Sequence, residues 1–169
     1  MGGIIIYFEF DDFYIELIDN HDLDNIVDLY NSNKLFLVSH TGRESITKEW
    51  INNELSTMKD TRFCSLKVVQ KSSNTIIGVI DIKTEKETYL SLLMIHNKYR
   101  GCGIGTIVYE GLERYIKFLG SKYVRIDVVT NYDKNVLEFW IKKGFKKLEN
   151  ITLNWDKNEL PAVVMKKKL

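Results

Sequence analysis

The sequence predicts an α/β domain of the α+β kind, organised around a central strand–turn–helix–strand unit. Three observations support this class. An apolar segment at 92–95 leads into a glycine-rich turn, a helix and a second apolar segment at 123–129. Strand-like segments at 63–70 and 76–83 precede that unit. The chain has 169 residues, of which 44% are hydrophobic, so residues 1–169 can form one domain with a sizeable core.

The first third of the chain is predicted to form a β-hairpin and two helices. Asp11-Asp12 lies between two strand-like segments and suits the turn of a hairpin. Asp22 and Ser45 can accept hydrogen bonds from the free N–H groups at a helix start, so we expect each to begin a helix. The predicted elements are strands at 4–10 and 13–18 and helices that end near Tyr30 and Met58.

Strands dominate the rest of the chain, with an amphipathic helix in the middle. Apolar residues recur at helical spacing over 104–119, and Gly120 suits the left-handed position after a helix. The polar run at 72–74 suits a turn between strands, and Gly144 suits the end of another helix. The predicted elements are strands at 63–70, 76–83, 88–95, 123–129, 145–153 and 160–168 and helices at 104–119 and 134–143.

The most informative segment is the turn at 100–105, Arg-Gly-Cys-Gly-Ile-Gly, which joins a strand to the central helix. Glycines at alternate positions let the backbone approach a ligand closely and adopt positive φ values. The helix that follows directs its unpaired N–H groups and the positive end of its dipole at this turn. With the charge of Arg100, these features favour a phosphate or pyrophosphate, and so a nucleotide-bearing cofactor.

Known kinds of glycine-rich turn fit this segment to different degrees. A Walker loop is excluded, because no Gly-Lys-Ser/Thr follows the first glycine at the required distance. A dinucleotide-binding turn requires Gly-x-Gly-x-x-Gly, whereas the third glycine here comes one place early, although Asp127 imitates the ribose-binding acid. A tight turn without a ligand stays open from the residues alone.

Charge is distributed unevenly along the chain. Residues 1–60 carry 12 acidic and four basic side chains, whereas residues 61–169 carry 11 acidic and 20 basic ones. The basic part can attract an anionic cofactor and the acidic part a cationic acceptor. The alternative is that most of these charges are solvated surface. No basic stripe with interleaved aromatic residues is present, so we expect no nucleic-acid partner.

The composition also bears on compartment and metal binding. No apolar stretch has the length of a membrane span, and the apolar segment at 3–8 has no basic leader. Cys64 and Cys102 form neither a disulfide framework nor a metal motif. We therefore expect a cytoplasmic protein that binds no metal and no membrane.

Two motifs resemble those of the GNAT superfamily of acetyl-CoA-dependent N-acetyltransferases. The turn at 100–105 has residues at all fixed places of that superfamily's Arg/Gln-x-x-Gly-x-Gly/Ala signature. Residues 133–145 resemble its second signature, Asn-x-x-Ala-x-x-Phe-Tyr-x-x-x-Gly-Phe, with Trp140 in place of the tyrosine. The resemblance covers about residues 13–169 and is tightest over 89–146.

The resemblance implies a mixed, largely antiparallel sheet of about seven strands, flanked by about four helices, in a single acetyltransferase domain over 1–169. It implies acetyl-CoA as co-substrate, with the pantetheine arm between two splayed strands and the pyrophosphate on the glycine turn. The residues to which it assigns cofactor binding are Leu93, Met94, Ile95, Arg100, Gly101, Cys102, Gly103, Ile104, Gly105, Thr106, Asn135 and Trp140.

Acetyl transfer requires a neutral amine, whereas an alkylamine has a pKa near ~10.4, so a proton must be removed. Relatives often carry a glutamate base at the position of Tyr89, and Glu87 lies two residues earlier on the same strand face. We predict Glu87 as the base or acceptor-binding acid, with Asp127 as its rival.

The departing thiolate either leaves unaided, as a stable anion, or receives a proton. Relatives use a tyrosine at the position of Trp140 for this step, and an indole cannot act as an acid at neutral pH. We therefore expect Trp140 to form a wall of the cofactor channel. If the thiolate does not leave unaided, the alternative proton sources are Tyr89, Tyr132 and water.

The acceptor is expected to be a small cationic molecule with a primary amine, bound by a monomer or a homodimer. A protein N-terminus or lysine is the alternative acceptor. A third reading is a non-catalytic acyl-CoA-binding sensor, which the missing tyrosine keeps open. Thiol release measured with a panel of amines separates an enzyme from a sensor.

Overall fold

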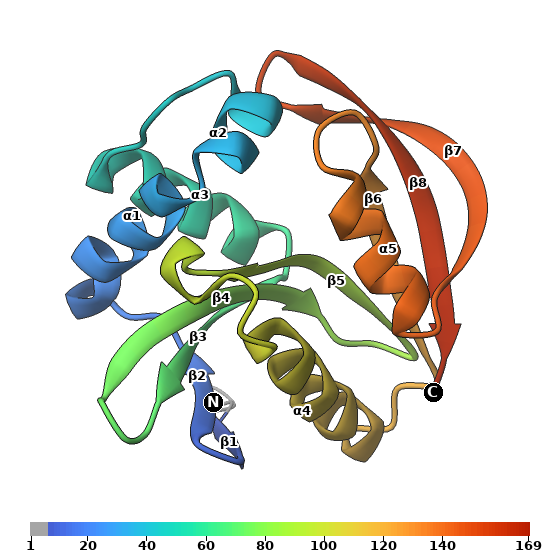
Figure 1. Cartoon of the computed structure of the whole chain (residues 1–169), viewed down its shortest axis with the longest axis horizontal. Coiled ribbons are helices and arrows are strands. Elements are labelled where there is room, and N and C mark those ends of the chain that lie inside the picture. Colours follow the sequence, from blue (N-terminus) through green and yellow to red (C-terminus); the bar gives the residue numbers. More distant parts are fainter. Residues whose placement is uncertain (1–6) are drawn as a thin grey trace.

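The computed structural model describes residues 7–169, in which helices cover both faces of one mixed sheet (Figure 1). The sheet order is β1-β2-β3-β4-β5-β6-β8-β7, and all neighbouring strands are antiparallel except β5 and β6. The strands are β1 (Tyr7–Phe10), β2 (Phe13–Leu17), β3 (Cys64–Gln70), β4 (Thr75–Lys83), β5 (Glu87–Ile95), β6 (Tyr123–Val129), β7 (Lys146–Trp155) and β8 (Asn158–Lys168).

Five α-helices and two short 3-10 helices connect the strands of the described chain. None of the described helices is long and apolar enough to cross a lipid bilayer. The α-helices are α1 (Leu23–Ser32), α2 (Lys34–Thr41), α3 (Lys48–Asp60), α4 (Ile104–Phe118) and α5 (Lys134–Lys142), and the 3-10 helices are η1 (Asn20–Asp22) and η2 (Asn97–Tyr99).

Side chains of the central strands alternate between the two faces of the sheet and build two cores. Ile80 and Ile82 of β4 pack in a core that includes Tyr109 of α4 and Trp140 of α5. On the other face, Val79 packs in a core formed with α1, α2 and α3. The helices that precede β3 and those that follow β5 are therefore held on opposite faces of the sheet.

The predicted fold class is confirmed, with eight strands and five α-helices in the described residues against about seven and about four expected. The hairpin about Asp11 forms between β1 and β2. Gly120 and Gly144 follow α4 and α5 with φ values of 91° and 92°, as expected of C-cap glycines. The strand expected at 4–10 lies partly outside the described residues, and its described part is β1.

One of the two predicted helix starts is confirmed, since Asp22 occupies the N-cap position of α1. Its carboxylate makes no capping hydrogen bond to that helix, however, because it accepts from the Asp19 N–H and the Lys67 ammonium. Helix α3 begins at Lys48, and its cap is Thr47, not Ser45.

Helix α2 was not predicted. Its apolar residues are spread around the helix, since Leu37 is buried while Leu35 and Val38 are about half exposed. A short helix with apolar residues on several sides has no clear amphipathic pattern.

Candidate active site

The parallel strands β5 and β6 separate after a short stretch of pairing, which ends at Tyr89 and Arg125. The β4–β5 ladder shifts register beside Asp81, and Ser91 is the extra residue of this β-bulge. Among the described residues, the edge of β5 that faces β6 therefore has no partner strand over residues 90–95. This edge opens into a pocket.

The glycine-rich turn enters α4 with several N–H groups unpaired. Gly101 and Gly103 have φ values of 78° and 76°, in the left-handed region that glycine adopts without strain. Ile107 donates to the Gly103 carbonyl oxygen at 3.3 Å, whereas no described backbone group accepts from the N–H groups of residues 104–106. Together with the helix dipole, these N–H groups form a site suited to an anion.

Arg100 connects the turn to α5. Its guanidinium forms an ion pair with Asp133, and Asp133 also accepts a hydrogen bond of 3.0 Å from the backbone N–H of Asn135. The Asp133 side chain, which is 9% exposed, thus caps α5 and fixes it against the turn. Both ends of this contact line the same pocket.

A cavity of about 720 Å³ lies between the turn, the free edge of β5 and α5, and we call it the glycine-turn pocket. Of the predicted cofactor residues, only Cys102 does not line it, because its side chain is exposed, with the sulfur 3.9 Å from the Arg100 carbonyl oxygen. The predicted residues that do line it are Leu93, Met94, Ile95, Arg100, Gly101, Gly103, Ile104, Gly105, Thr106, Asn135 and Trp140.

Trp140 lies in the wall of the glycine-turn pocket and is 7% exposed. Its ring centroid lies 4.9 to 5.3 Å from those of three aromatic side chains, Phe139, Tyr109 and Phe145. Tyr132 lines the same pocket, and burial raises its pKa to about 12. Its phenol therefore carries its proton at neutral pH, as a proton donor must.

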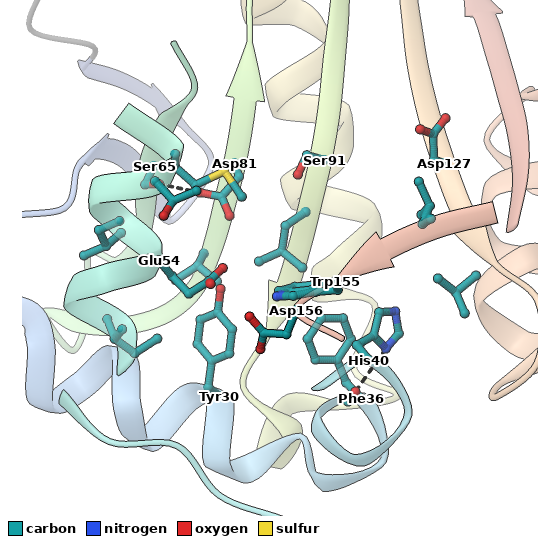
Figure 2. A pocket seen from close by; sticks show the side chains of 18 of the residues that line it. Tyr30, Phe36, His40, Glu54, Ser65, Asp81, Ser91, Asp127, Trp155 and Asp156 are labelled. Atoms are coloured by element: carbon teal, nitrogen blue, oxygen red, sulfur yellow. Dashed lines mark hydrogen bonds between the residues drawn. The ribbon is translucent and has the colours of Figure 1, made fainter. Parts of the chain in front are cut away.

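A second cavity, of about 420 Å³, lies between the helices α1 to α3 and the strands β4 to β6 (Figure 2), and we call it the acidic pocket. Four carboxyl side chains line it, and its described lining contains no lysine or arginine. Aromatic rings form much of the rest of the wall. The carboxyl groups are those of Glu54, Asp81, Asp127 and Asp156, and the rings are those of Tyr30, Phe36, His40, Tyr89 and Trp155.

Two of these carboxyl groups have raised pKa values. Asp81 is 7% exposed and accepts a hydrogen bond from the Ser65 hydroxyl, and burial raises its pKa to about 6. Burial also raises the pKa of Glu54, and the nearby charges of Asp156 and Asp81 raise it further. A bound cation would relieve this cost of holding negative charges close together and away from water.

The two pockets are continuous. Ser91 and Leu92, at the bulge in β5, line both of them. A molecule in the glycine-turn pocket would therefore meet one in the acidic pocket at this place, which we call the junction. The residues that line both pockets are Phe36, His40, Ser91, Leu92, Asp127 and Val129.

His40 of α2 reaches the junction as a neutral ring. Its Nδ1 lies 3.0 Å from the Phe36 carbonyl oxygen and 2.8 Å from the Ser39 hydroxyl oxygen. Burial lowers the pKa of His40 to about 4. The ring also stacks on Phe36 with 4.0 Å between the centroids.

The structure brings together two of the three predicted catalytic residues. The Tyr89 hydroxyl donates to Asp127 at 2.8 Å, and Arg125 donates to both Asp127 oxygens at 3.0 and 3.1 Å. Tyr89 and Asp127 both line the acidic pocket. Glu87 lines neither pocket, and its carboxylate accepts a hydrogen bond of 2.6 Å from Lys166.

Sequence reasoning missed most of the residues that give the acidic pocket its chemistry. One signal was present: Asp81 interrupts the apolar run of β4, and a carboxyl group in a buried strand is rare. Glu54 and Asp156 lie in polar segments and cannot be distinguished by sequence from solvated acids. The missed residues are Tyr30, His40, Glu54, Asp81 and Asp156.

An anion site and an acidic pocket thus meet beside a splayed strand pair, an arrangement that suits a transferase with a nucleotide-bearing donor. Residues 35–169 match the family model described as an acetyltransferase (GNAT) domain. The chain therefore belongs to the GNAT acetyltransferase family and is an acetyl-CoA-dependent acetyltransferase.

Solved structures share this fold over nearly the whole chain. An acetyltransferase from Thermus thermophilus has a TM-score of 0.75 at 18% identity, covering 94% of this chain and 98% of its own. The ribosomal-protein-S5-alanine acetyltransferase from Vibrio fischeri has a TM-score of 0.71 at 17% identity, covering 96% of both chains. A candidate acetyltransferase from Salmonella typhimurium, solved with acetyl-CoA, has a TM-score of 0.62 at 10% identity, covering 94% of both. No curated protein sequence gives a significant match.

Proposed function

We propose that this chain transfers the acetyl group of acetyl-CoA to the primary amine of a small cationic molecule. The observation that carries this proposal is the junction between two pockets of opposite character. One presents unpaired N–H groups at a helix start, and the other presents four carboxyl groups and no lysine or arginine among its described lining residues. A negatively charged donor and a positively charged acceptor would thus approach the junction from different sides.

The glycine-turn pocket suits acetyl-CoA in its chemical groups. The N–H groups of residues 104–106 would hold the pyrophosphate. The free edge of β5, with Leu93 and Ile95, would offer backbone groups to the pantetheine arm, and Trp140 would cover its apolar side. Acetyl-CoA supplies an acetyl thioester, which these contacts would hold at the junction.

The reaction proceeds by direct attack. The amine nitrogen bonds to the acetyl carbonyl carbon, the bond from that carbon to sulfur breaks, and CoA leaves. The nitrogen loses two protons: Asp127 receives one and passes it to solvent, and the thiolate receives the other through Tyr132. Asp127 takes this role because it is the only one of the predicted acids that lines both pockets, and Tyr89 positions its carboxylate.

The size of the acidic pocket supports a small acceptor over a protein amine. At about 420 Å³ it falls within the range of pockets that enclose small molecules, roughly 300–1,000 Å³. The experiment is continuous thiol release from acetyl-CoA with a panel of small amines and with peptides that present a free N-terminus or a lysine. The proposal predicts turnover with small amines and little with peptides. Peptide turnover alone would reassign the acceptor, and CoA binding without any turnover would favour the sensor.

A further inference from the structure

The carboxyl groups of the acidic pocket differ in whether they already have a cationic partner. Asp127, at the junction, is paired with Arg125. Glu54, Asp81 and Asp156 form no ion pair with any residue that the structure describes. Three carboxyl groups thus face one cavity without a neutralising charge from the described chain. Water reaches these groups to different degrees, since Asp156 is exposed, Glu54 is half-buried and Asp81 is only 7% exposed.

Tyr30 provides an independent sign that a polar ligand binds here. Its side chain is 6% exposed, and its hydroxyl makes no hydrogen bond with the described residues. Figure 2 shows this hydroxyl directed into the pocket, toward the carboxylate of Glu54. Burial, followed by the charges of Asp81 and Glu54, raises the pKa of Tyr30 well above its ordinary value. The hydrogen-bond partner of this hydroxyl must therefore come from within the pocket, and a polar ligand can supply it.

Tyr30 and the three unpaired carboxyl groups lie away from the junction, where acetyl transfer is proposed. Tyr30, Glu54, Asp81 and Asp156 line the acidic pocket but not the glycine-turn pocket. Figure 2 shows them on one side of Ser91, with Asp127 on the other. A molecule whose amine is acetylated beside Asp127 would therefore extend toward them.

The wall of the acidic pocket between Asp127 and the group of Tyr30, Glu54, Asp81 and Asp156 is mostly apolar and aromatic. Leu92 and Trp155 contribute to it, and Figure 2 shows the Trp155 ring above Asp156. A methylene chain would pack on such a wall, and an aromatic face also attracts a nearby cation. An ammonium has three N–H donors, which suits several carboxylates and one hydroxyl.

We propose that the acceptor carries a second cationic group, bound by Glu54, Asp81, Asp156 and Tyr30, and is therefore an alkyl diamine or a longer linear polyamine. This inference rests on the proposed function for the identity of the reacting amine. It adds a second binding site on the same molecule and a reason for a cluster of unpaired acidic side chains in the acceptor pocket.

The test compares 1,5-diaminopentane with pentylamine, which has the same carbon chain and one ammonium fewer. Binding to the CoA-loaded protein is measured by calorimetry, and kcat/KM is measured by thiol release from acetyl-CoA. We expect the diamine to bind at least about ten-fold more tightly, the effect of one or two hydrogen bonds between charged groups. Glu54→Gln and Tyr30→Phe should each reduce this preference, because the diamine should lose more affinity and more kcat/KM than pentylamine.

The matched control is Glu49→Gln, because Glu49 lies exposed on the same helix and does not line the pocket. It should leave both affinities unchanged. Equal binding of the two amines, or an equal loss for both in Glu54→Gln, would overturn the second site, even if both amines are acetylated. Tight, Glu54-dependent binding of the diamine without thiol release would instead uphold the site and refute the proposed transfer.

Discussion

Gly103 allows the cofactor site to be tested apart from the stability of the fold. A Cβ placed on Gly103 would meet no atom within 4 Å, so a glycine is not required there by packing within the protein. Its φ of 76° disfavours a side chain, and the space beside it belongs to the glycine-turn pocket. Gly103→Ala therefore has two separable effects, one on the backbone and one on the ligand.

Gly120 offers a matched control. Its φ is 91°, an added Cβ would again meet nothing within 4 Å, and it does not line the glycine-turn pocket. A left-handed alanine costs about 1–2 kcal/mol, and the less flexible unfolded chain offsets about 0.4–1 kcal/mol of this. Each variant should thus lose about 1 kcal/mol of unfolding free energy, or about 2–4 °C in Tm for a chain of this size.

The two variants should differ only in ligand binding. A methyl group at Gly103 would displace the pyrophosphate from the N–H groups of residues 104–106. Losing one or two hydrogen bonds to a charged phosphate, at about 1.5–3 kcal/mol each, weakens binding by about ten-fold to more than a hundred-fold. Calorimetric titration with CoA measures this, with thermal unfolding as the stability control. If Gly103→Ala binds CoA as tightly as Gly120→Ala, the turn does not hold the pyrophosphate.

Three further predictions concern other parts of the site. Trp140→Phe should retain most of the turnover. Trp140→Ala should lose about 3–5 kcal/mol of stability and bind CoA weakly, because a cavity opens beside the pocket. Loss of turnover in Trp140→Phe with unchanged CoA affinity would show that the indole is catalytic. Asp81→Asn should raise the unfolding free energy by about 1–3 kcal/mol at pH 8, because the pKa of Asp81 in the folded state, about 6, exceeds its unfolded value and the ionised carboxylate opposes folding. Denaturant unfolding should show that this gain vanishes below pH ~4. A gain that does not depend on pH would contradict the prediction. In thiol-release assays, Asp127→Asn should lower kcat at least about ten-fold, whereas Glu87→Gln should change it little. A larger loss of kcat in Glu87→Gln than in Asp127→Asn would identify Glu87 as the base.

The donor side of the site could be predicted from the sequence because its geometry is local. A glycine turn followed by a helix start creates unpaired N–H groups wherever it occurs, so residues 100–106 carry their own signal. Trp140 was placed by its position in a second motif, and the structure puts it in the wall of the same pocket.

The acceptor side could not be predicted in the same way, since its residues come from distant segments. Tyr30, Glu54 and Asp156 belong to α1, α3 and the β7–β8 turn, and only the tertiary fold brings them to one cavity. Helix α2, which supplies His40, has no amphipathic pattern to reveal it.

The prediction for Glu87 shows a different limit of strand periodicity. Periodicity fixes the face on which a side chain lies but not its neighbour on an adjacent strand. Glu87 forms its ion pair with Lys166 of β8, a strand that no local pattern places near the start of β5.

The central claim is that an amine in the acidic pocket receives the acetyl group of a donor in the glycine-turn pocket. The most direct measurement is thiol release from acetyl-CoA as 1,5-diaminopentane is titrated, with mass spectrometry of the amine product. We expect a saturable, amine-dependent rate and one acetylated amine for each thiol released. A rate that does not change with amine concentration, in a protein that binds CoA, would contradict it.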